Sequence, residues 1–430
     1  MFGMLIPYRT NPLYFACPSI EPLAPTLAGL APLAARLSGM EAAVILEGAR
    51  TPIGKFLGGL SEVTTVELGT IAAKEAMRRS NIEPEQIDQT IFGHARQAGN
   101  GPNTGRQVSV RSGVPKEVSA YNVNIACGSG MKAVQVGAQQ IMLGDSEVAL
   151  VGGMENMTRV PFLLDRMRTG YRMGDATVYD AMYRDGLLDP LCGLVMGETA
   201  ENLVDLYDIS RQEQDEFALE SQQKAEAGKA ARAEETFPVD TPGPKGTTLT
   251  VTEDEHPRPD TTMEKLAKLP PVFRKEGSVT AGNASGITDG AAAMVLMSES
   301  RAKAEGREPL ARIVGMSWAG VDPAIMGIGP VPATQKVLEK TGLSLADMDL
   351  IEVNEAFAAQ VIACERELKF DRDKLNRRGG GIALGHPVGM SGARLTLTLA
   401  YQMRDEGVPL GLATLCVSGG QGVSIILERS

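Results

Sequence analysis

The stretch NIEPEQIDQTIFGHA at residues 81–95 returns in altered form as GLSLADMDLIEVNEA at residues 342–356, an offset of 261 residues (342 minus 81). Both copies run from a polar turn through an aspartate and an apolar strand to a polar group at the strand end. A shared pattern over this length indicates two copies of one structural unit.

Strand-like and helix-like segments alternate from Met40 onward. Runs such as AAVILEG and VALVGG are typical of buried strands, while LGTIAAKEAMRRS and GSGMKAVQVGAQQIML have helical periodicity. This alternation predicts an α/β fold with a buried, largely parallel sheet. We expect an N-terminal half at residues 40–308 and a C-terminal half at residues 309–430, with an insertion at about residues 158–280.

The insertion has a composition of its own. It includes SRQEQDEFALESQQKAEAGKAARAEE, which predicts one long polar helix opened by a capping box of Ser210 and Glu213. The following FPVDTPGPKGTTLTVTEDEHPRPDTT has the prolines and turn formers of a loop. We expect this loop domain to cover the functional site.

Residues 1–39 differ from the rest of the chain, with six prolines, two arginines, one glutamate and no lysine. Repeated proline disfavours the amphipathic helix of an organellar transit peptide, although the scarcity of acidic residues fits one. We expect a disordered N-terminal extension, and the alternatives of a targeting segment or an upstream start stay open.

The composition excludes several classes of protein. A formal net charge of -11 argues against nucleic-acid binding, and no apolar run approaches the ~20 residues that span a bilayer. The five cysteines include no C-x-x-C pair, so neither a disulfide framework nor a zinc site is predicted. We expect no metal, no cofactor, no membrane contact and a cytoplasmic location.

Cys127 and His386 form the central chemical pair. Cys127 lies between an apolar strand and a helix in NIACGSGMKAV, where the positive end of the helix lowers the pKa of a thiol. The 261-residue offset carries Cys127 to within two residues of His386, so the two lie on equivalent turns. The carboxyl ends of strands form the ligand crevice of such folds. We expect a nucleophilic Cys127, with His386 as its base, to meet Asn354 and Cys416 there.

The second cysteine and the asparagine have two interpretations each. Cys416 in LCVSGGQG is either an acid/base thiol or an ordinary strand cysteine, and Asn354 suits the orientation of a water or the polarisation of a carbonyl. The other cysteines and histidines receive a structural or surface interpretation; they are Cys17, Cys192, Cys364, His94 and His256.

Seven motifs together resemble the thiolase family, in the right order across residues 40–430. They are NIACGSGM, GGMENM, MGETAEN, TAGNASGITDGAA, VNEAF, GGGIALGHPVGMSGAR and LCVSGGQG. The resemblance implies duplicated α/β halves with mixed sheets in a layered α/β/α/β/α arrangement, an inserted loop domain, coenzyme A thioester substrates and homo-oligomers built from dimers.

Roles follow from the resemblance, residue by residue. It implies that Cys127 is the acylated nucleophile, that His386 is its base and that Cys416 is the second acid/base. Asn354 would hold a water that forms one oxyanion hole with His386, and the backbone N–H groups of Cys127 and Ser418 would form the other. The residues implied to bind coenzyme A are Arg258, Ser285, Ala281, Met196 and Phe357.

Three residues depart from the family pattern. Val195 replaces a histidine found in many acetoacetyl-CoA thiolases, Arg378 replaces an asparagine, and Ser418 replaces a glycine. The function expected first is acetyl-CoA C-acetyltransferase. A 3-ketoacyl-CoA thiolase of fatty-acid β-oxidation and a non-catalytic acyl-CoA-binding paralogue stay open. A 3-ketoacyl carrier-protein synthase would need a second histidine where Cys416 stands.

Overall fold

The computed structural model describes residues 41–430; the predicted extension at residues 1–39, with Cys17, lies outside the described residues. The described chain builds a ten-stranded sheet in the order β14-β15-β16-β13-β1-β12-β5-β3-β4, with β2 paired to β12. These strands are β1 (Ala43–Arg50), β2 (Gly54–Lys55), β3 (Gln89–Gly93), β4 (Ser119–Val123), β5 (Val148–Asn156), β12 (Thr288–Ser298), β13 (Ala311–Gly320), β14 (Leu350–Val353), β15 (Leu410–Val417) and β16 (Gln421–Arg429).

The two copies of the repeated unit have the same strand order. The first copy places β3, β5, β12 and β1 side by side, and the second places β14, β15, β16 and β13. In each copy the first pair is parallel and the next two are antiparallel. Asp88 accepts the N–H of Val148 at the start of β5, and Asp349 accepts that of Leu410 at the start of β15. These aspartates are related by the predicted offset.

The sheet is mixed, as predicted, but antiparallel neighbours outnumber parallel ones. Within residues 41–430 parallel pairing in this sheet joins only β3 to β4, β3 to β5 and β14 to β15. A short turn links β15 to β16, and a connection of that length permits only antiparallel pairing. β1 pairs with β13 through Val44 and Ile45, which merges the strands of both halves into one sheet.

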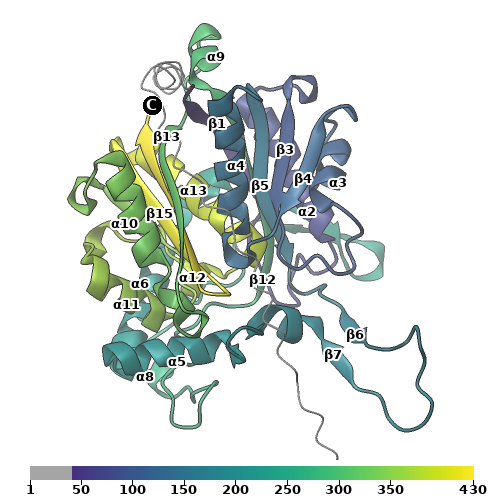
Figure 1. Ribbon diagram of the computed structural model, residues 1–430, viewed down its shortest axis with the longest axis vertical. Helices are drawn as coiled ribbons and strands as arrows, with labels where there is room; N and C mark the ends of the chain where they lie inside the picture. The colour runs from purple at the N-terminus through teal and green to yellow at the C-terminus, as the bar shows by residue number, and fades with distance from the viewer. Residues whose placement is uncertain (1–40) are drawn as a thin grey trace, which may run out of the picture. The chain divides into compact units, whose positions relative to one another are not determined.

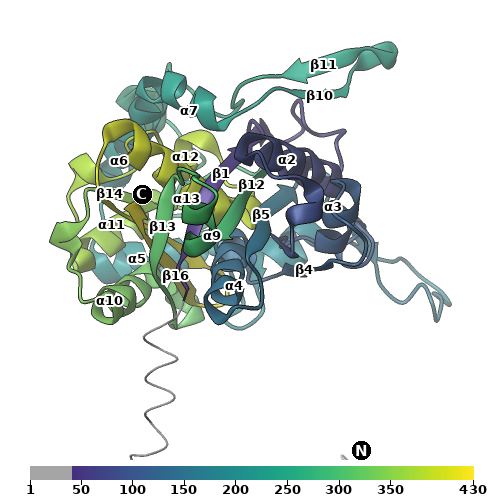
Figure 2. The ribbon, with the colours of Figure 1, turned by 90° about the horizontal axis from the view of Figure 1, so that it is seen from above.

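Helices form three layers around the two halves of the sheet (Figures 1 and 2). The layer between the halves consists of α4 (Ser129–Leu143) and α13 (Val388–Glu406). The outer layers are α2 (Thr65–Ser80) with α3 (Thr104–Arg111) on the first half, and α10 (Pro330–Thr341) with α11 (Ala358–Leu368) on the second. The predicted α/β/α/β/α arrangement is therefore present.

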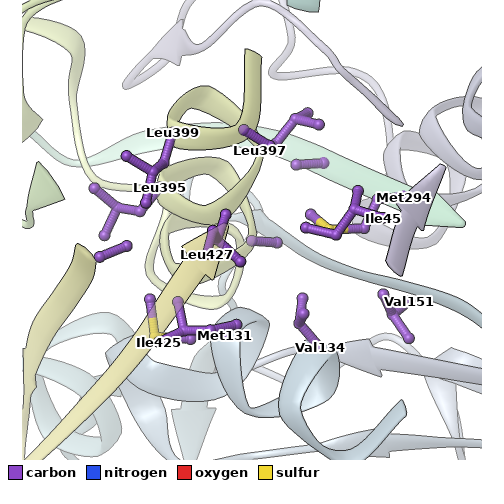
Figure 3. Close-up of a cluster of buried hydrophobic side chains, with 14 of the residues drawn as sticks. Ile45, Met131, Val134, Val151, Met294, Leu395, Leu397, Leu399, Ile425 and Leu427 are labelled. Atoms are coloured by element: carbon purple, nitrogen blue, oxygen red, sulfur yellow. The ribbon is translucent and has the colours of Figure 1, made fainter. Parts of the chain in front are cut away.

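The largest hydrophobic cluster surrounds the middle layer (Figure 3). Its members come from α4, α13 and the strands on both sides; the labelled side chains are Ile45, Met131, Val134, Val151, Met294, Leu395, Leu397, Leu399, Ile425 and Leu427. Full burial of one such side chain contributes about 1.5–3 kcal/mol. The middle layer is thus held firmly against both halves.

Glycines let α4 and α13 touch at their first turns. A Cβ on Gly130 would lie 2.7 Å from the backbone nitrogen of Ala393, and one on Gly392 would lie 2.4 Å from that of Met131. A larger side chain would push the two helices apart. This close approach brings the turns that precede both helices together.

The insertion between β5 and β12 contains helices and short strands. They are β6 (Phe162–Leu164), β7 (Val178–Asp180), a π-helical turn (Tyr183–Leu187), β8 (Leu188–Asp189), β9 (Leu194–Val195), α5 (Met196–Tyr207), α6 (Arg211–Ala227), α7 (Lys229–Glu235), β10 (Val239–Pro242), β11 (Thr248–Val251) and α8 (Met263–Ala267); α9 (Glu299–Ala304) follows β12. Within residues 41–430 no helix is both long and apolar enough to cross a membrane.

Two predictions for the insertion need correction. The capping box of Ser210 and Glu213 is present, but the predicted single helix is divided into α6 and α7 at Gly228. A Cβ at Gly228 would lie 2.7 Å from the Cα of Arg378, so the backbones meet there and glycine is needed. The predicted loop contains the β10–β11 hairpin, because the threonines and valines of that stretch pair across a turn.

Candidate active site

A cavity of about 360 Å³ lies where the predicted site residues converge. Its wall includes residues of both halves and of the insertion. The predicted site residues that line it are Cys127, His386, Ser418, Arg258, Ser285, Ala281, Met196 and Phe357. The remaining two, Asn354 and Cys416, are buried behind this wall. The tertiary structure therefore brings together residues that are almost 300 positions apart in the chain.

Cys127 lies on a strained turn, the 3-10 helix Ala126–Gly128 between β4 and α4. Ala126 has a φ of 48°, a left-handed conformation that costs a residue with a Cβ roughly 1–2 kcal/mol. Asn124 accepts the N–H of Ala126 at 3.0 Å, and the hydroxyl of Ser129 donates to its carbonyl at 2.6 Å. These two side chains hold the turn that presents Cys127 to the cavity.

The predicted acidification of Cys127 by its helix is not found. Burial raises the pKa of the thiol above its ordinary value, although the charge of Arg96 and the N–H of Ser418 act in the opposite direction. The loss of hydration of a thiolate outweighs these favourable contacts. Cys127 therefore rests as a thiol and needs a base to become a nucleophile.

His386 is held as a neutral imidazole between α12 (Gly381–Leu384) and α13. Its Nδ1 lies 2.5 Å from Ser391 Oγ, and the Ser391 hydroxyl donates to the Pro387 carbonyl at 3.0 Å. Because that hydroxyl proton is already used, Ser391 accepts from Nδ1–H, and Nε2 keeps its lone pair. Burial, with the charges of Arg394 and Arg96, lowers the pKa of His386 to about 3. The ring is thus a free base at neutral pH.

Asn354 and Cys416 are buried behind the cavity wall, next to His386 and Cys127. Asn354 Nδ2 lies 3.4 Å from His386 Nε2, at the end of β14. Cys416 is fully buried near the end of β15, in a cluster with Met196 and Phe357. Burial raises the pKa of Cys416 well above its ordinary value, and the nearby Cys127 raises it further. Cys416 is therefore a protonated thiol in the resting structure.

Ser418 occupies a position where glycine is not required. Ser418 does not have a positive φ, whereas the two residues that follow it, Gly419 and Gly420, have φ of 84° and 77°. Asp189 accepts the N–H of Gly419 at 2.8 Å, which fixes the turn after β15. The backbone N–H of Ser418 faces the thiol of Cys127. The departure at this position leaves the backbone donor intact.

Two family models match almost all of the described chain. The model for the thiolase N-terminal domain matches residues 43–300, and that for the thiolase C-terminal domain matches residues 307–429. The chain belongs to the thiolase family. The resemblance inferred from the seven motifs is confirmed, and this thiolase is an acyltransferase.

Relatives of known structure and function are similar over the same span. Acetyl-CoA acetyltransferase of Escherichia coli (strain K12) is 49% identical over 393 residues, which cover 91% of this chain and 100% of the relative. The crystal structure of Bacillus anthracis acetyl-CoA acetyltransferase gives a TM-score of 0.88 at 47% identity and covers 91% of this chain and 99% of its own. Human mitochondrial 3-ketoacyl-CoA thiolase gives 0.88 at 43% identity, with coverages of 91% and 99%. The predicted fold class is confirmed.

The predicted coenzyme A residues of this thiolase come from the insertion, from the segment between it and β12, and from the start of α11. The N–H of Arg258 is accepted by Gln222 at 2.8 Å, and the N–H of Ser285 by the Ala356 carbonyl at 2.9 Å. Phe357 packs edge-to-face on Phe273 at 6.1 Å between ring centroids. Phe273 lines the same wall and carried no signal in the sequence. These contacts hold a largely apolar part of the cavity wall, with Arg258 beside it.

Three cavity or support residues were missed from the sequence. His256, predicted as structural or surface, lines the cavity, with its Nδ1 2.9 Å from the Ala383 carbonyl. His256 stands two residues before Arg258, and this proximity in the sequence could have indicated that it lies near the same cavity. Arg96 also lines the cavity, and the 261-residue offset makes it the counterpart of Phe357. Ser391 follows His386 by about one helical turn.

The other residues discussed in the sequence analysis lie apart from Cys127, His386 and Cys416. His94 is buried with its Nε2 3.3 Å from Glu155, and Cys364 is a buried residue of α11, whereas Cys192 is partly exposed. Arg378 forms an ion pair with Asp405 at 2.6 Å and does not line the cavity. Val195 does line it, at the start of α5. In the described part of the chain no group of His, Cys, Asp and Glu could hold a metal ion.

Proposed function

We propose that this thiolase is an acetyl-CoA C-acetyltransferase that interconverts two acetyl-CoA with acetoacetyl-CoA and CoA. The observation that supports this proposal most strongly is that Cys127 and a neutral His386 line one cavity, with the protonated Cys416 behind them. The names of the Escherichia coli and Bacillus anthracis relatives support this activity.

In the first half-reaction His386 Nε2 takes the Cys127 proton while the sulfur attacks the thioester carbon of acetyl-CoA. The carbonyl electron pair moves to oxygen, where the N–H groups of Cys127 and Ser418 are suited to receive it. As the tetrahedral intermediate collapses, the C–S bond to CoA breaks and Cys416 gives its proton to the departing thiolate, while His386 keeps the proton of Cys127. An acetyl group remains on Cys127.

In the second half-reaction Cys416, left as a thiolate by the first, removes a proton from C2 of a second acetyl-CoA. The enolate oxygen would be held by His386 and a water on Asn354. The carbanion attacks the acetyl carbonyl on Cys127, the new C–C bond forms, and Cys127 leaves with the proton held by His386. In thiolysis Cys416 instead gives its proton to C2 of the departing acetyl-CoA. The raised pKa of Cys416 favours that role in the resting enzyme and makes its thiolate a strong base in condensation.

A 3-ketoacyl-CoA thiolase for longer chains is the second candidate. The apolar lining of the cavity favours it, and so does valine at position 195 in place of a histidine. The human mitochondrial structure with a TM-score of 0.88 bears that name. Turnover of acetoacetyl-CoA beside C8 and C16 3-ketoacyl-CoA separates the two candidates: a preference above tenfold for the longer chains would favour the second.

Acylation of Cys127 is the step to test first. Acetyl-CoA should add one acetyl group to the wild-type chain by intact mass, and Cys127→Ser should remove the adduct. Cys192→Ser is a matched control, because Cys192 is a partly exposed thiol that does not line the cavity. An adduct that persists in Cys127→Ser would refute the assignment, and so would one that vanishes in the control.

We also propose a homo-oligomer built through the arm at residues 162–180, and a cytoplasmic location with no metal or cofactor. The arm projects as the β6–β7 hairpin (Figure 1) and exposes Phe162, Met173 and Val178 to 67%, 94% and 56%. Exposed apolar side chains grouped in this way are typical of interfaces. Sedimentation should give a smaller species for Phe162→Asp with Met173→Asp, and an unchanged mass would refute the interface.

A further inference from the structure

Arg96 lines the same cavity as Cys127 and has no role in the mechanism proposed above. It follows β3 in the first half, where Glu155 accepts the N–H of Ala95 at 3.2 Å and that of Arg96 at 3.1 Å. Its side chain lines the cavity together with Cys127 and Leu187. Glu155 thus fixes the backbone of Arg96 and directs the side chain across the site.

The guanidinium of Arg96 is bound by peptide carbonyls and not by a carboxylate. Nη2 donates to the Gly186 carbonyl at 2.8 Å and Nη1 to the Asp185 carbonyl at 3.3 Å, while the buried Nε has no acceptor. No carboxylate in residues 41–430 comes within 4.0 Å of the guanidinium nitrogens. Two peptide carbonyls orient this cation but do not neutralise it.

Two arginines and no acidic residue line the cavity, and they serve different parts of it. The field of Arg96 lowers the pKa of both Cys127 and His386, so this cation lies at the reacting end. The field of Arg258 acts on His256 and Asp260 in the insertion. Arg258 is therefore suited to bind the phosphates of coenzyme A. Phosphates bound there would not pair with Arg96, whose guanidinium stays free for a group at the reacting end.

Resting on the proposed acyl exchange at Cys127, we propose that Arg96 selects 3-ketoacyl thioesters whose acyl chain ends in a carboxylate. An acyl group on Cys127 extends into the cavity beside the guanidinium. A terminal carboxylate there would form a charge-assisted pair away from bulk water, where such pairs are strong. A terminal methyl group would instead leave the cation unpaired.

The reaction balances as an ordinary thiolysis. Cys127 loses its proton to His386 and attacks the C3 ketone, the C2–C3 bond breaks, and Cys416 gives a proton to C2 of the departing acetyl-CoA. The ω-carboxyacyl group stays on Cys127. The sulfur of a CoA thiol then attacks it and loses its proton to Cys416, and Cys127 leaves with the proton held by His386. The products are acetyl-CoA and the shortened ω-carboxyacyl-CoA.

Two six-carbon thioesters test this selectivity. One is the CoA thioester of 3-oxohexanedioic acid, with a free terminal carboxylate, and the other is 3-oxohexanoyl-CoA. We expect kcat/KM of the wild-type enzyme to favour the charged thioester by tenfold or more. Arg96→Met should lower the ratio of the two kcat/KM values at least tenfold, and Arg96→Lys should lower it less. Arg184→Met is the matched control, since Arg184 lies on the same π-helical turn as Gly186 but outside the cavity.

The outcomes separate this proposal from the proposed function. A wild-type preference for 3-oxohexanoyl-CoA would overturn it without any variant, and so would an equal loss for both substrates in Arg96→Met, because Arg96 would then serve only Cys127 or the Gly186 turn. A change of the ratio in Arg184→Met would also overturn it. Failure of the wild-type enzyme to turn over acetoacetyl-CoA would contradict the proposed function instead.

Discussion

At the scale of single residues, the site depends on side chains that orient the reacting groups. Ser391 determines which nitrogen of His386 carries the proton, because its own hydroxyl is donated to Pro387. We expect Ser391→Ala to lower kcat about tenfold or more with little change in KM, since the ring loses its orientation while the substrate surface stays. Steady-state kinetics check this, with Ser391→Thr as a control that keeps the acceptor. An unchanged kcat would contradict it.

Ser418 tests the role of a backbone donor. Its ordinary φ means that glycine brings no relief of strain, so Ser418→Gly should change kcat less than ~tenfold, about 1.4 kcal/mol of barrier. Ser418→Pro removes the N–H and should cost roughly a hundredfold or more, the scale of one lost oxyanion-hole donor. A folded proline variant with near-normal turnover would mean that other groups hold the oxyanion.

At the scale of elements, the contact of α4 with α13 sets the distance between the turns that carry Cys127 and His386. Gly130→Ala would place a Cβ 2.7 Å from the backbone of Ala393. Overpacking of this kind costs about 1–3 kcal/mol, and we expect a lower midpoint of thermal unfolding together with reduced kcat. In Gly320→Ala the nearest atom is 3.8 Å away, so this control should unfold near the wild-type temperature. Equal midpoints for both variants would show that the helices are not in tight contact.

At the scale of the whole molecule, buried carboxyl groups link stability to pH. Burial raises the pKa of Asp289 to about 6, against the opposing hydrogen bonds from Thr158. Between pH 3.8 and about 6 the folded state binds a proton at Asp289 that the unfolded state has released, so the free energy of unfolding falls as pH rises through this window. Relative to Asp289→Asn, the wild type should lose about 1–3 kcal/mol there. Urea unfolding at several pH values checks this, and parallel curves would exclude it.

The motifs and their spacing were sufficient for the family, the α/β class and the repeated unit, and they singled out Cys127, His386 and Cys416, which the structure brings together. The repeat could be recognised because Asp88 and Asp349 accept equivalent backbone hydrogen bonds at the starts of β5 and β15. A hydrogen bond of this kind requires an aspartate at the same place in each copy, so it appears as a pattern in the sequence. The roles of the site residues, and the boundaries at residue 308 and at residues 158–280, stay predictions.

Long-range contacts set what the sequence did not reveal. The helix position of Cys127 predicted an acidic thiol, but burial by distant segments raises its pKa instead. The sheet is mostly antiparallel, and β1 pairs with β13, because of which strands meet in the folded chain. The sequence of a hydrophobic strand does not show whether its neighbour will run parallel or antiparallel to it. Arg96 and His256 line the same cavity because folding brings their side chains together. Local patterns record local hydrogen bonds, whereas desolvation and the meeting of side chains depend on every segment packed around them.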